Sequence, residues 1–126
     1  MELARGAIPV SKTIALSQTA IVTLNADGNG TVTLGPSVPG TQWQPSTGVI
    51  SVSSNNSGAT QFACYQGFIS DATFLGGSLS GASDTCTFDL TLWPGQTIVG
   101  IWSGGDSGAT AVLSIYGQQV IPSGDS

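Results

Sequence analysis

Apolar and polar residues alternate along most of the chain, in short runs separated by turn-forming residues. In residues 30–35, Val32 and Leu34 share one side of an extended segment, while threonines fill the other side. No segment longer than a turn has apolar residues spaced as on one face of a helix. The pattern therefore predicts β structure from end to end.

The predicted strands are separated by clusters of Gly, Pro, Asn, Asp and Ser. They span residues 19–25, 30–35, 48–53, 60–66, 86–92, 96–103 and 109–116, with a short edge strand at 118–121. The run 96–103 is apolar on both faces, which is typical of a central strand. Turn residues at 26–29 and 104–108 favour hairpins. An all-β fold follows: an antiparallel β-sandwich of about seven or eight strands, immunoglobulin-like or jelly-roll.

The length of 126 residues fits one domain. We assign residues 19–121 to the sandwich, residues 1–18 to an N-terminal arm or edge strand, and residues 122–126 to a loose C-terminal tail. The longest irregular stretch is 67–85. Because it contains Phe68 and Phe74, part of it is expected to pack or to form a short strand.

Charged residues make up only 7% of the chain, and the net charge is −5. The two cations, Arg5 and Lys12, cannot form a basic track, which excludes nucleic-acid binding and a polybasic membrane patch. No apolar run approaches the ~18 residues of a membrane-spanning helix. Charge keeps free monomers apart, so its scarcity favours a subunit of an assembly, including a homo-oligomer. The alternative is a monomer made soluble by Ser and Thr.

Catalytic chemistry has few candidates, because the chain has no histidine. A Ser-His-Asp triad and a Cys-His pair are therefore excluded, and Lys12 is the only lysine. The four acids that could form a carboxylate pair are Asp71, Asp84, Asp89 and Asp106. Asp84 and Asp106 lie in turns, where capping of backbone amides explains them better, and Asp89 alternates outward on a strand. We expect no catalytic residue and no enzymatic activity.

Residues 25–30 resemble the opening of a calcium loop, with oxygen ligands at alternate positions and a glycine in sixth place. Pro36 stands where the bidentate glutamate belongs. A plain turn explains the segment better, so we expect neither a metal nor a cofactor.

The two cysteines, Cys64 and Cys86, fall in predicted strands. A disulfide between them would close a 22-residue interval and stabilise the fold by about 3 kcal/mol. Two unpaired core cysteines are the alternative. Disulfides imply an oxidising compartment, yet Pro9, Ser11 and Lys12 interrupt any signal-peptide core near the N-terminus. We therefore expect the chain to stay in the cytosol or to leave by another route.

Aromatic and acidic residues are the candidates for contacts with a partner or a glycan. Trp43 and Trp93 lie beside Pro45 and Pro94, whereas Trp102 is expected in the core. Aromatic rings can serve as sugar platforms, although Trp beside Pro also commonly packs on the end of a sandwich. The candidate contacts are Trp43, Tyr65, Trp93 and Asp106.

Three stretches together suggest a family: residues 35–45, 94–96 and 101–111. They resemble small β-sandwich proteins encoded among the virion structural genes of tailed phages that infect actinobacteria. The resemblance covers about residues 19 to 117, and its most specific part is Trp-x-Gly-Gly-Asp-x-Gly-Ala, beginning at Trp102. Many relatives carry Pro where this chain has Ser107.

The resemblance implies a non-enzymatic virion protein, most simply a minor tail or tail-tip subunit. Its partners would be other virion proteins and copies of itself, with host surface glycans as a further contact. Such a protein is made in the host cytoplasm and reaches the outside by lysis, where a disulfide could close. A capsid decoration protein is the first alternative, and a carbohydrate-binding module the second.

Overall fold

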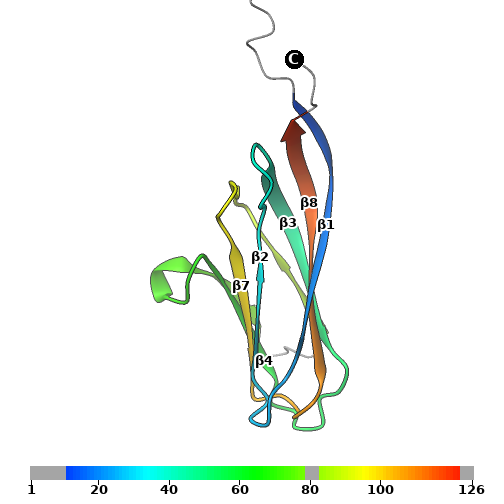
Figure 1. The fold of residues 1–126 in the computed structure, drawn as a ribbon. Helices are drawn as coiled ribbons and strands as arrows, with labels where there is room; N and C mark the ends of the chain where they lie inside the picture. Colours follow the sequence, from blue (N-terminus) through cyan, green and yellow to red (C-terminus); the bar gives the residue numbers. More distant parts are fainter. Residues whose placement is uncertain (1–10, 79–82, 123–126) are drawn as a thin grey trace, which may run out of the picture.

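The computed structural model describes residues 11–78 and 83–122 as two antiparallel four-stranded sheets. Figure 1 shows β2 and β7 in one layer and β1, β3 and β8 in the other. The strands are β1 (Ser11–Thr23), β2 (Gly30–Leu34), β3 (Gln42–Val52), β4 (Gln61–Gln66), β5 (Phe74–Ser78), β6 (Ser83–Thr87), β7 (Ile98–Ser103) and β8 (Thr110–Pro122). The predicted all-β sandwich is confirmed.

The strand order is β1-β8-β3-β6 in one sheet and β2-β7-β4-β5 in the other. Of the pairs that follow each other along the chain, only β4 and β5 are neighbours within a sheet. All other connections between these strands cross from one layer to the other. An eight-stranded double sheet with this crossing pattern is a jelly roll, the second of the two predicted sandwich types.

The predicted hairpins at 26–29 and 104–108 are wrong, because each turn joins strands of different sheets. The reason is that the two turns bond to each other. Leu24 N donates to Ala109 O at 2.8 Å, and Gly105 N donates to Gly28 O at 3.0 Å. Gly28 has φ +78°, and a Cβ there would lie 2.0 Å from Gly105 O, so this approach requires glycine.

The first and the last strand along the chain extend beyond their predicted bounds. β1 begins at Ser11 rather than at residue 19, so residues 11–18 form the first part of an edge strand. β8 continues without interruption through the segment 118–121, which was predicted as a separate strand. Residues 1–10 of the predicted arm and residues 123–126 of the predicted tail lie outside the described residues.

Two boundaries near tryptophans also differ from the prediction. β3 begins at Gln42, so Trp43 lies in a strand and not in a turn. β6 ends at Thr87, and beyond it a hydrogen bond from Phe88 N to Ser46 O and an isolated bridge between Trp43 and Leu92 continue the contact with β3. The predicted alternation nevertheless holds, because Phe88 and Leu92 are buried and Asp89 is exposed.

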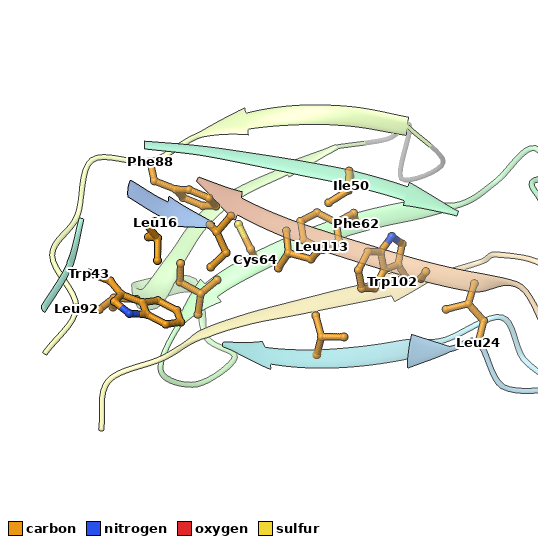
Figure 2. Packing of buried hydrophobic residues seen from close by; sticks show 14 of the residues in the cluster. Leu16, Leu24, Trp43, Ile50, Phe62, Cys64, Phe88, Leu92, Trp102 and Leu113 are labelled. Atoms are coloured by element: carbon orange, nitrogen blue, oxygen red, sulfur yellow. The ribbon is translucent and has the colours of Figure 1, made fainter. Parts of the chain in front are cut away.

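The core lies between the two sheets and draws on both (Figure 2). Trp102 of β7 is fully buried, and its ring lies 4.8 Å from that of Phe62, centroid to centroid, at 54°. Leu113 and Ile115, which belong to β8 in the other sheet, point into the same core and have no exposed surface. β7 lies between β2 and β4, as expected for the run that is apolar on both faces.

Candidate functional site

The outer surface of the β1-β8-β3-β6 sheet carries no ionised side chain among the positions described. Because Leu16, Ile50 and Leu113 point into the core, the residues alternating with them face outward. This neutral face is defined by Ser17, Thr19 and Ile21 of β1, Thr47, Val49 and Ser51 of β3, and Val112, Ser114 and Tyr116 of β8.

The neutral face combines hydroxyls with a few exposed apolar groups. The hydroxyls of Thr19 and Ser114 are hydrogen-bonded across two strands at 3.0 Å. Ile21 is 65% exposed and Tyr116 is 42% exposed. A surface of this kind can pack against a protein without bringing charges into an interface, where unpaired charge is unfavourable.

A groove lies where this sheet overhangs the other. β1 and β8 reach further than β2 and β7 toward the end at which β8 stops (Figure 1). The groove has a volume of about 680 Å³, and its walls include Ile14, Leu34 and Gln119. Trp43 also borders the groove but is only 6% exposed, because β3 carries its side chain into the core. Trp43 therefore offers a ligand little surface.

Trp93 is the exposed tryptophan, with 54% of its surface accessible. It opens a tight turn in which Gln96 N donates to Trp93 O and Trp93 N donates to Gln96 Oε1, both at 2.9 Å. Gln96 also lines a second groove of about 450 Å³, together with Gln66 and Phe68. Phe68 is 65% exposed. Aromatic and amide groups thus share one region of the surface.

Tyr65 is half-buried on β4. Its ring packs edge-on against Phe74 of β5, with 5.6 Å between the centroids and 64° between the planes. This contact joins two neighbouring strands, and Phe74 itself remains 52% exposed. Tyr65 consequently serves local packing, and contact with a partner stays a prediction.

Asp106 caps the turn that follows β3. Its carboxylate accepts hydrogen bonds from Asn56 N at 2.7 Å, Ser57 N at 2.8 Å and the Ser54 hydroxyl at 2.8 Å. These donors hold the pKa of Asp106 below its ordinary value of 3.8. The capping role expected for this aspartate is confirmed, whereas its contact with a partner stays a prediction.

The residues of the Trp-x-Gly-Gly-Asp-x-Gly-Ala stretch accordingly have structural roles. Trp102 fills the core, Gly105 bonds to the turn after β1, and Asp106 caps the turn after β3. Gly104 has φ +70°, and a Cβ there would lie 2.6 Å from Ala59 O. The motif holds three turns together at one end of the sandwich.

Cys64 and Cys86 face each other across the two sheets as free thiols. Cys64 lies deep in the core (Figure 2). The hydrogen bond between the thiols lowers the pKa of Cys86, helped by the backbone of Gly48, and raises the pKa of Cys64. Cys86 is therefore the thiol that ionises first, and the disulfide stays a prediction.

The described residues contain no group of three or more His, Cys, Asp or Glu side chains placed to hold a metal ion. Nor do these residues include a helix long and apolar enough to cross a membrane. No protein-family model and no curated protein matches the chain.

The neutral face was missed as a candidate site because its residues are individually ordinary. The signal was present: Ser17, Thr19 and Thr23 occupy outward positions that alternate with Leu16, Ala20 and Val22, and Ile21 is the apolar residue among them. Recognising it required the strand order, since only the pairing of β1, β8 and β3 assembles three polar faces into one surface.

Proposed function

We propose that this chain is a non-enzymatic structural subunit of a phage virion, placed in the tail as a minor tail or tail-tip protein. The observation that carries the proposal is the neutral face. A virion subunit remains in contact with its neighbours, and a sheet surface of hydroxyl and apolar groups suits a permanent protein interface. The same chain has few charges elsewhere to keep it dispersed.

The jelly-roll strand order supports the proposal without deciding it. Jelly rolls occur in viral capsid proteins, but also in lectins and cupins, and a fold does not by itself specify a function. The resemblance in residues 35–45, 94–96 and 101–111 favours the virion among these uses. A capsid decoration protein would use the same face, and its location on the particle distinguishes it from a tail subunit.

The absence of enzymatic activity is part of the proposal. The chain has no histidine, and the carboxylate of Asp106 accepts three hydrogen bonds that lower its pKa. A general acid needs a raised pKa instead. The described part of the chain thus offers Asp106 as a cap and not as a proton donor.

Purified particles of the phage that encodes this chain provide the test. We expect mass spectrometry to find the chain in virions banded by density, and gold-labelled antibody against it to mark the tail in electron micrographs. A non-structural phage enzyme, absent from washed particles, is the control. Label on the head would identify a capsid decoration protein instead. Absence of the chain from virions would contradict the proposal.

A glycan-binding role is the second candidate, and the exposed ring of Trp93 favours it. Trp93 adjoins Gln96 in a tight turn, and Gln96 lines the 450 Å³ groove with the exposed ring of Phe68. Aromatic faces and amides are groups that contact sugars. On a glycan array we expect Trp93→Ala to abolish binding. Ile21→Ala, which alters the neutral face instead, should preserve it. Binding unchanged in Trp93→Ala would contradict this role.

A further inference from the structure

Four strands lie at the edges of the two sheets, and one of them differs from the rest. β2, β5 and β6 have five residues each, whereas β1 has 13. An edge strand leaves one row of backbone N–H and C=O groups without partners in its own sheet. β1 therefore presents by far the longest row that another strand could use.

β1 also lacks the features by which edge strands commonly resist pairing. Its register with β8 runs without a bulge from Ser11 to Thr23, and it contains no proline. Its single charge, Lys12, stands next to the start of the strand. By contrast, the register of β5 shifts opposite Cys64, and β6 carries Asp84.

The side chains of β1 suit a second copy of the same strand. Ser17 and Thr19 are exposed and uncharged, and Ile21 adds an exposed apolar group. Because each copy has a net charge of −5, two copies repel each other in most relative orientations. They meet with least repulsion along a strand that contains no acid.

The free edge of β1 is long enough for a stable interface between two chains. Near Thr23 the strand is flanked by β2, since a Cβ on Gly30 would lie 2.9 Å from Leu24 and 3.0 Å from Val22. The stretch from Ser11 to Ile21 lies before that point. Antiparallel pairing over this stretch would form about ten backbone hydrogen bonds, the number found in a typical protein interface.

We propose that β1 pairs antiparallel with β1 of a second copy about a two-fold axis, joining two four-stranded sheets into one continuous sheet. Two identical antiparallel strands satisfy each other symmetrically, which is the geometry of a closed dimer. The two neutral faces would then become one larger uncharged surface. This pairing does not depend on the proposed virion role, because it follows from the edges of the sandwich alone.

Sedimentation velocity and light scattering on the purified chain test the pairing, with charge placed at matched positions. Ser17 lies one residue from the middle of the stretch from Ser11 to Ile21, so antiparallel overlap of that stretch brings the two Ser17 residues close together. We expect the unaltered chain to dimerise, and both Ser17→Lys and Ser17→Glu to weaken dimerisation at least about tenfold through like-charge repulsion. An equimolar mixture of the two variants should regain the dimer.

The control is Ser83→Lys, which places the same charge on β6, the opposite edge of the same sheet. It should dimerise like the unaltered chain. Recovery in the mixture excludes misfolding as the cause of dissociation. A monomeric unaltered chain, a dimer insensitive to Ser17→Lys, or equal dissociation by Ser83→Lys would each overturn the proposal.

Discussion

The two sheets of this sandwich share one core but differ in the length of their strands. The β1-β8-β3-β6 sheet has strands of 13, 13, 11 and five residues, whereas no strand of the β2-β7-β4-β5 sheet exceeds six. The outer face of the longer sheet carries no ionised side chain at the described positions, and Ile21 and Tyr116 are exposed on it. The shorter sheet also exposes an apolar group, since Phe74 is 52% exposed while it packs against Tyr65. This difference in strand length is the reason that we propose β1, the long edge strand of the longer sheet, as the site of protein contacts.

The largest expected effects come from the core that the sheets share. Trp102→Ala, in the shorter sheet, should lower the free energy of unfolding by about 3–5 kcal/mol, and Leu113→Ala, in the longer sheet, by about 2–5 kcal/mol. Both side chains are fully buried. Urea unfolding measures the change. A loss below about 1 kcal/mol in either variant would show that its sheet does not contribute to a common core.

Oxidation of the cysteines would join the two sheets covalently. Treatment with oxidised glutathione should form the Cys64–Cys86 disulfide and release two molecules of reduced glutathione, with Cys86, the more exposed of the two cysteines, attacking first. We expect stabilisation of about 3 kcal/mol against urea, reversed by reductant. Cys86→Ala, which cannot form the bridge, is the control. Two thiols that remain open to alkylation after unfolding of the oxidised protein would contradict the prediction.

Asp106 provides a pH-dependent contribution at the end of the sandwich where the turns meet. Because its pKa is lowered in the folded chain, its carboxylate stabilises the fold above pH 3.8, and this contribution is lost as the pH falls through the lowered pKa. Asp106→Asn should therefore be less stable than the unaltered chain at pH 7. The gap should close in strong acid. Thermal unfolding at both pH values tests this, and an equal gap at both would contradict it.

The smallest effect concerns Trp93. Since more than half of its surface is exposed, Trp93→Ala should change the free energy of unfolding by only about 0.5 kcal/mol. Trp43→Ala should remove several times more, because its ring is buried against the groove wall. Urea unfolding of the pair gives the comparison. Similar losses in both variants would mean that Trp93 is part of the structural core.

Most of the strands could be predicted from the sequence, but the way in which they are connected could not. Alternation placed β2 almost residue for residue and marked β7 as central, because period-two burial is a local property. The turns after β1 and β7 were mistaken for hairpins, since their Gly, Asn and Asp residues suit either arrangement. What decides between them is the hydrogen bond from Gly105 to Gly28, which joins distant parts of the chain.

The candidate site was predictable only in part, for the same reason. The cap by Asp106 follows from its residue type in a turn. The burial of Trp43 does not, because it depends on the bridge to Leu92, far along the chain. The neutral face also depends on long-range pairing, because Thr19, Ser114 and Val49 become neighbours only when β8 inserts between β1 and β3.

Hydrogen exchange at two protein concentrations tests most directly whether the longer sheet is the associating one. Amides of β1 between Ser11 and Ile21 should exchange more slowly as the concentration rises, because pairing with a second copy protects them. Amides of β2 and β5, the edges of the shorter sheet, should exchange at the same rate at both concentrations. Protection that grows at β2 or β5 but not at β1 would contradict the assignment of contacts to the longer sheet.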